Sequence, residues 1–266
     1  MPWSPFDILL SLPAFALVLF RLTGLVLAAP VLASRYVPVR IRGALLVVLA
    51  AMVYPVVALP EYRQVTLPAA LAGAVSEVMI GAAIGLSLSL LLTGAEVVGE
   101  VVGQQAGLAL GRVFDPTIND ETSVVGQIYA VVFTTIFLVA GGHRAAVAAV
   151  LDTYEVIPIL SYGFESGVVL LLVEMLTAAF VLGIRLAAPV VIALFLTATA
   201  LGFLSRTMPQ LNILTVGFTV RAIVAIAVAA IALASCDDLM LDAIFNALET
   251  IRSVFGVDPA ATRLVS

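Results

Sequence analysis

Residues 167–204 decide the fold of this chain, and they read GVVLLLVEMLTAAFVLGIRLAAPVVIALFLTATALGFL. The run is apolar throughout except for a few small polar residues and two charges, Glu174 and Arg185. At about 1.5 Å per residue, one helix of this length is far longer than the ~30 Å hydrocarbon core of a bilayer. The run therefore predicts either two segments broken near Ala188-Pro189 or one long kinked helix that projects beyond the bilayer.

The composition of the whole chain points to a membrane protein. Of its 266 residues, 63% are hydrophobic and 11% are charged, whereas about 25% of the residues in a soluble domain are charged. A core of this size cannot absorb so much apolar surface, so lipid or partner subunits must cover the rest. Only helices satisfy every backbone group within lipid, apart from closed barrels. We therefore expect an all-α integral membrane protein. The net charge of −5 argues against nucleic acid as a partner.

Five other apolar segments accompany this run. They are Ile8–Ser34, Gly43–Leu59, Leu67–Ala95, Val124–Ala140 and Ile213–Ala234, which gives about six long helices in all. The first has no basic flank or small-residue cleavage site, so we expect a retained helix rather than a signal peptide. The arginines of 35–42 favour a cytoplasmic loop there. Residues 152–165 form an acidic region with a turn at Pro158. Residues 237–255 predict an amphipathic helix with one apolar face, made of Leu239, Ala243, Phe245, Leu248 and Ile251.

One polar stretch divides the chain near its middle, Arg112 to Ser123. Its backbone cannot face lipid, so it must lie in water, inside protein or at the wall of an aqueous path. Just before it, Gly99, Gly103 and Gly107 recur at four-residue spacing on one helix face. This spacing predicts either close helix–helix packing or a crowded, water-facing interior.

Several charges fall inside the apolar segments. They are Arg21, Glu77, Glu96, Glu100, Glu174, Arg185 and Arg221. Charges at membrane depth pair with one another, lie near an interface, or line an aqueous path. The sequence alone leaves these alternatives open for each residue.

The chemistry of an enzyme is absent from the sequence. All 12 basic residues are arginine, so the lysine of a nucleotide-binding P-loop is missing. The single histidine, His143, and the single cysteine, Cys236, lie far apart and predict no metal site. No serine lies in a Gly-x-Ser-x-Gly turn that would prepare a nucleophile. We therefore expect no catalytic residue, cofactor or metal.

Several motifs in order along the chain resemble one family. They are Arg21-Leu22-Thr23-Gly24, Ala29-Pro30-Val31-Leu32, Val37-Pro38-Val39-Arg40-Ile41-Arg42, Gly103-Gln104-Gln105-Ala106-Gly107, Phe114-Asp115-Pro116, Gly142-His143, Arg206-Thr207-Met208-Pro209-Gln210-Leu211-Asn212-Ile213 and Gly217-Phe218. Together they resemble the FliR/SctT family of type III secretion export-gate proteins. The Phe-Asp-Pro element is more similar to the flagellar branch than to the injectisome branch.

The resemblance implies a fold and a setting. The fold would be a FliP-like part over 1–166, a FliQ-like helical hairpin over 167–235, and a C-terminal amphipathic segment and tail over 236–266, arranged as kinked hairpins. The protein would join FliP and FliQ in a hetero-oligomeric export gate of the flagellar basal body, in the bacterial inner membrane. FlhB would lie nearby, lipid would surround part of the gate, and unfolded flagellar export substrates would pass through it.

The resemblance also assigns roles to residues. The mid-chain loop 111–124 would help close the channel as a plug, and its candidate residues are Phe114, Asp115, Pro116, Asn119, Asp120 and Glu121. The hairpin turn would contact a partner through Arg206, Pro209, Gln210 and Asn212. Two alternatives stay open at this point. One is an injectisome SctT-type subunit, and the other is a stand-alone solute permease, which the charges within the apolar segments favour but for which no inverted repeat is evident.

Overall fold

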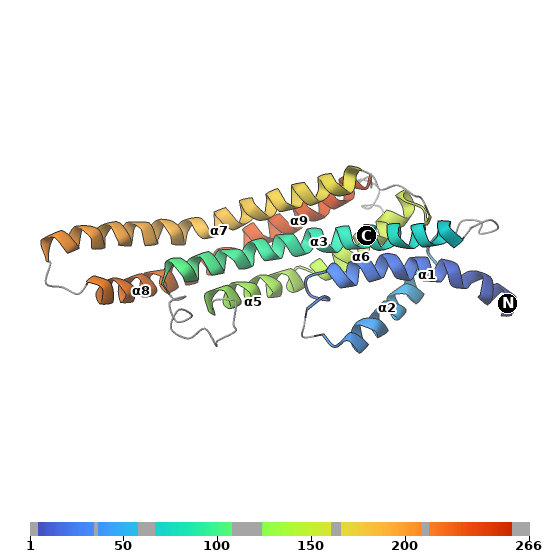
Figure 1. Cartoon of the computed structure of the whole chain (residues 1–266), viewed down its shortest axis with the longest axis horizontal. Helices are drawn as coiled ribbons and strands as arrows, with labels where there is room; N and C mark the ends of the chain where they lie inside the picture. Colours follow the sequence, from blue (N-terminus) through green and yellow to red (C-terminus); the bar gives the residue numbers. More distant parts are fainter. Residues whose placement is uncertain are drawn as a thin grey trace. The chain divides into compact units, whose positions relative to one another are not determined.

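The computed structural model describes residues 5–34, 37–57, 67–107, 124–160, 166–208 and 213–256. Within these ranges the regular structure is entirely helical. The helices are α1 (Pro5–Ala28), α2 (Val39–Val53), α3 (Leu67–Gln105), α5 (Val124–Val139), α6 (Gly142–Val156), α7 (Ser166–Thr207), α8 (Ile213–Ala234) and α9 (Asp237–Val254) (Figure 1). The prediction of an all-α chain is confirmed for the part that the structure describes.

The overlong run of residues 167–204 forms one helix. α7 has 42 residues and continues through Pro189, so of the two alternatives the single long helix is confirmed. α3 is also a single helix of 39 residues, and it joins the run Leu67–Ala95 to the following residues, which include Gly99 and Gly103. At about 1.5 Å per residue, each of these helices is close to twice as long as the ~30 Å core of a bilayer.

Other boundaries agree with the sequence in some places and differ in others. α8 spans Ile213–Ala234 as predicted, and α5 ends one residue before the predicted Ala140. α2 has 15 residues, fewer than the ~20 that cross a bilayer, and its first turn includes Arg40 and Arg42 of the predicted loop. α6 continues to Val156, so the first residues of the predicted acidic region are helical.

The buried face of α9 corrects one prediction. Met240, Ile244, Ala247 and Ile251 are buried, whereas Phe245 is 55% exposed. The buried positions recur at spacings of three and four residues, which defines one stripe of a helix. Phe245 follows Ile244 directly and therefore points away from that stripe, so its place on the apolar face was predicted wrongly.

Among the residues that the structure describes, three helices are long and apolar enough to cross a membrane. They comprise Ala70–Gln105, Val168–Thr207 and Thr215–Ala234, and the number rises to four if α5 and α6 are counted as one broken span. The presence of these helices supports the assignment of the chain as an integral membrane protein. The expected number of about six spans stays a prediction.

The chain divides into two compact units that are discontinuous in sequence. Unit 1 comprises Met1–Leu90, Gly141–Leu176 and Ile244–Ser266, and unit 2 comprises Leu91–Ala140 and Thr177–Ala243. Three helices, α3, α7 and α9, contribute residues to both units. The division into 1–166, 167–235 and 236–266 follows the order of the chain instead, and it stays a prediction.

Unit 1 is built on close contact between the backbones of α1 and α3. A Cβ atom on Gly24 would overlap the carbonyl oxygen of Val78, and one on Gly81 would overlap the carbonyl oxygen of Arg21. The hydroxyl of Ser89 donates a hydrogen bond to the carbonyl oxygen of Ala28 on the same seam. α1 also packs against α2 and α6. Glycine is required at this seam because any side chain would push the two backbones apart.

In unit 2, glycines allow similar close contacts between the backbones of other helices. A Cβ on Gly94 of α3 would lie 2.7 Å from the carbonyl oxygen of Ala179 on α7. A Cβ on Gly99 would lie 2.6 Å from the Cα atom of Gly126 on α5. Gly99 therefore serves helix packing, one of its two predicted roles. Gly107 ends α3 with a φ of 79°, a conformation that favours glycine.

Candidate functional site

The charges inside the apolar segments separate into three groups. Arg21 and Glu77 are buried and paired with each other. Glu96, Glu174 and Arg185 are exposed on α3 and α7. The half-buried charges are Glu100, whose carboxylate accepts a hydrogen bond from Gln104 at 3.3 Å, and Arg221 on α8. Pairing thus holds for Arg21 and Glu77, and whether the other five charges lie near an interface or line an aqueous path stays a prediction.

Most residues of the predicted plug and hairpin turn lie outside the described residues. They are Phe114, Asp115, Pro116, Asn119, Asp120, Glu121, Pro209, Gln210 and Asn212. Arg206 is described, and it lies exposed in the last turn of α7. The roles of all these residues therefore stay predictions.

A polar cluster lies in the interior of unit 1, centred on Arg21. The Nε atom of Arg21 donates to Oε2 of Glu77 at 2.6 Å, and the two side chains are 0% and 2% exposed. Its Nη1 donates to the hydroxyl of Thr153 at 3.0 Å. Its Nη2 donates to the carbonyl oxygen of Ile157 at 3.1 Å. Each of the three guanidinium nitrogens thus has an acceptor, as a buried cation requires.

Two further contacts complete this cluster. The ring of Tyr154 lies 4.0 Å from Cζ of Arg21, a cation–π geometry, and its hydroxyl donates to the carbonyl oxygen of Val18. Oε1 of Glu77 accepts a hydrogen bond from the backbone N–H of Leu160 at 3.4 Å. Leu160 has a φ of 71°, in the left-handed region that non-glycine residues rarely adopt. The cluster therefore joins α1, α3, α6 and the turn after α6.

Sequence reasoning selected Arg21 and Glu77 but missed Thr153 and Tyr154. These two residues stood within the predicted acidic region, and no local spacing relates them to an arginine more than a hundred positions earlier. The groups around Arg21 are satisfied by one another and leave no nucleophile or base poised for a reaction. The arrangement fits a structural role, which is to hold three helices in register.

A second ion pair in unit 1 is more exposed. Nε of Arg252 on α9 donates to Oδ2 of Asp152 on α6 at 3.0 Å, with the two side chains 26% and 20% exposed. Partly solvated pairs of this kind contribute at most about 1 kcal/mol. The pair orients the C-terminal half of α9 but contributes less than the apolar stripe beside it.

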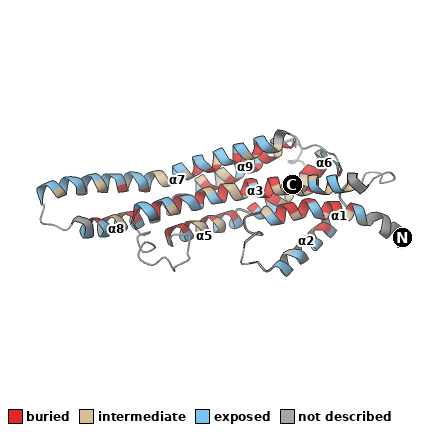
Figure 2. Ribbon diagram, in the orientation of Figure 1, coloured by how far each residue is buried: buried red, intermediate tan, exposed pale blue. Residues whose placement is uncertain are grey.

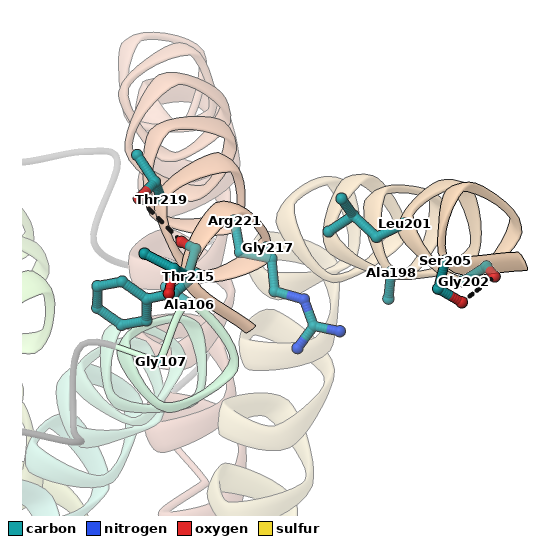
Figure 3. Close-up of a pocket in the computed structure, with 11 residues that line it drawn as sticks. Ala106, Gly107, Ala198, Leu201, Gly202, Ser205, Thr215, Gly217, Thr219 and Arg221 are labelled. Atoms are coloured by element: carbon teal, nitrogen blue, oxygen red, sulfur yellow. Dashed lines mark hydrogen bonds between the residues drawn. The ribbon is translucent and has the colours of Figure 1, made fainter. Parts of the chain in front are cut away.

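Unit 2 contains a cavity lined by residues of α7 and α8 and by the two residues that follow α3 (Figure 3). Its volume is about 820 Å³. The residues just after α3 contribute Ala106 and Gly107, and the C-terminal part of α7 contributes Ala198, Leu201, Gly202 and Ser205. α8 contributes Thr215, Gly217, Phe218, Thr219 and Arg221. A smaller cavity of about 230 Å³ shares Ala198 and Arg221 with it.

Arg221 carries the only charge among the described residues that line this cavity. Its side chain extends from α8 toward α7 (Figure 3). The hydroxyls of Ser205 and Thr219 donate to carbonyl oxygens of their own helices, at 2.7 and 3.1 Å. No described residue forms an ion pair or hydrogen bond with the Arg221 guanidinium. The cavity is thus apolar, with one cation that no described residue neutralises.

These features define a class, a helical membrane protein with a buried ion pair in unit 1 and an arginine at an apolar cavity in unit 2. Residues 12–247 match the model of bacterial export proteins, family 1, and the chain belongs to this family. The expected resemblance to the FliR/SctT proteins of type III secretion is thereby confirmed. Family members are components of the export apparatus and are not enzymes.

Relatives from both branches cover most of the chain. The flagellar biosynthetic protein FliR of Escherichia coli is 29% identical over 88% of this chain and 91% of its own length. The FliR protein of Bacillus subtilis is 25% identical over 92% of this chain and 95% of its own length. The Yop proteins translocation protein T of Yersinia pestis is 26% identical over 79% and 82%.

Proposed function

We propose that this chain is a channel subunit of a flagellar type III protein export gate, assembled with FliP and FliQ in the bacterial inner membrane. Unfolded flagellar export substrates pass through the gate, and FlhB lies close to the hairpin turn that includes Arg206. The flagellar assignment draws support from the Phe114-Asp115-Pro116 element and from the larger share of this chain that the Escherichia coli and Bacillus subtilis FliR proteins cover, compared with the Yersinia relative. An injectisome SctT-type subunit is the second candidate, favoured by the Yersinia relative.

The observation that carries this proposal is the exposed apolar surface of α7 and α8. In the most apolar windows of these helices only 28% and 17% of the residues are buried within the chain (Figure 2). Large exposed side chains include Phe180, Ile184, Phe195 and Phe203 on α7 and Ile223 on α8. Because α7 is close to twice as long as a bilayer is thick, lipid cannot cover all of this surface. Helices of partner subunits are the cover that we propose.

The composition of the purified complex tests this proposal. The full-length chain, tagged and extracted from its own membrane in mild detergent, is expected to carry several copies of two other small helical proteins around a single copy of itself. Native mass spectrometry measures these copies directly. A stable monomer or homo-oligomer that moves a solute in liposomes would contradict the export gate and favour the permease.

Deletion of residues 115–122 tests the plug. We expect the variant to assemble with its partners but to raise the ion conductance of the membrane, because Asp115, Asp120 and Glu121 would no longer hold the closed loop. Conductance of whole cells and the subunit composition of the purified complex are the two measurements.

A matched control replaces the same eight residues with a Gly/Ser segment of equal length. Leakage in both variants assigns closure to the side chains, whereas leakage in the deletion alone assigns it to the length of the loop. Unchanged conductance and unchanged export in the deletion strain would rule out the plug.

A further inference from the structure

The proposed function does not explain the charge of Arg221, which no described residue neutralises. Arg221 lies within Thr215–Ala234, one of the helices that are long and apolar enough to cross a membrane. A cation in such a helix is costly unless an anion accompanies it. No described residue supplies that anion, and an anionic ligand from outside the chain would neutralise Arg221.

The position of Arg221 along α8 fits the depth of a lipid phosphate. Arg221 lies less than two turns after Thr215, the first residue of the apolar span, which is about 10 Å along the helix. An arginine side chain at this depth extends toward the membrane surface and places its guanidinium near the headgroups. Arg206, at the nearby end of α7, adds to the positive charge at this end of the hairpin.

The walls of the cavity fit an acyl chain. Leu201 and Phe218 contribute apolar surface, and Gly202 and Gly217 leave space because they have no side chains. The volume of about 820 Å³ falls within the 300–1,000 Å³ range of sites for small ligands. A single carboxylate side chain from a partner would neutralise Arg221 but would leave most of this space empty.

We propose that the cavity between α3, α7 and α8 is a binding site for an anionic phospholipid. The guanidinium of Arg221 would donate two hydrogen bonds to the phosphate, and one acyl chain would lie along the apolar walls. Nothing in this proposal depends on the export gate, because it follows from the charge, the depth and the size of the cavity.

Lipid titration of the purified complex tests this site. The native complex containing the full chain is stripped of lipid, titrated with phosphatidylglycerol or phosphatidylcholine, and examined by native mass spectrometry. We expect Arg221→Gln to weaken binding of one phosphatidylglycerol by about tenfold or more and to leave phosphatidylcholine binding unchanged. Arg221→Lys keeps the positive charge but loses the two-pronged hydrogen bonding, so its affinity should lie between that of the native chain and that of Arg221→Gln.

Two other variants keep the test decisive. Arg185→Gln removes an exposed arginine of α7 and should leave lipid affinity unchanged. Ala198→Phe narrows both cavities without changing any charge, and it should weaken phosphatidylglycerol binding even if Arg221→Gln fails to fold. Unchanged lipid affinity in Arg221→Gln and Ala198→Phe would overturn the proposal. An Arg221→Gln complex that loses its partner subunits but binds phosphatidylglycerol as tightly as before would overturn it too. That result would assign Arg221 to a carboxylate of a partner subunit.

Discussion

Replacing Glu77 with alanine is expected to destabilise unit 1 by about 3–5 kcal/mol. The substitution leaves the Arg21 guanidinium buried at 0% exposure without its carboxylate. It also removes the acceptor for the backbone N–H of Leu160, which holds an unfavourable φ of 71°. Reversible unfolding of the protein in detergent, followed by circular dichroism, measures the change in the free energy of unfolding.

Two variants separate the charge from the loss of side-chain volume. Glu155→Ala removes an exposed carboxylate from α6 in the same unit and should change stability by less than about 0.5 kcal/mol. The double variant Arg21→Met with Glu77→Leu replaces the pair with apolar side chains and should recover most of the loss. A Glu77→Ala protein as stable as Glu155→Ala would show that the ion pair contributes nothing to the fold.

Replacing Gly81 with alanine should have an effect of similar size, about 3 kcal/mol or more. The added methyl group would overlap the carbonyl oxygen of Arg21 and would lie 2.9 Å from the backbone nitrogen of Leu25. Both contacts are with backbone atoms, so α1 and α3 must move apart to accept it. The same unfolding measurement reports this change.

The sign of the stability change distinguishes steric overlap from helix propensity. Alanine is the better helix former by about 1 kcal/mol, so intrinsic propensity alone predicts stabilisation. Gly43→Ala in α2 is the matched control, because nothing lies within 4 Å of the added atom, and it should be neutral or slightly stabilising. If Gly81→Ala behaved like Gly43→Ala, the close contact between α1 and α3 would be refuted.

The two substitutions should not be additive. Gly81 contacts the backbone of Arg21, and Glu77 contacts its side chain. Separating α1 from α3 already weakens the ion pair, so the double variant Glu77→Ala with Gly81→Ala should lose less stability than the sum of the single variants. Coupling of about 0.5–3 kcal/mol is usual for residues that share a contact.

The sequence by itself determined the class of the protein and many helix boundaries. The span Ile213–Ala234 coincides with α8, and α7 ends at Thr207, just before the Met208-Pro209 step. These predictions succeed because two costs add up residue by residue along the chain. One is the cost of leaving an apolar side chain in water, and the other is the cost of leaving a backbone group without a hydrogen bond in lipid. The ordered motifs also identified the family, since they are distributed over nearly the whole length of the chain.

Only the tertiary structure decided which charges form pairs. Arg21 and Glu77 are 56 positions apart and pair with each other, whereas Arg221 remains in a cavity with no partner among the described residues. The same is true of the buried face of α9, where Phe245 was placed wrongly. Hydropathy records how much each residue prefers an apolar setting, but not which neighbour meets it. That choice depends on how helices distant in sequence approach one another, and here glycines such as Gly24 and Gly81 control the approach.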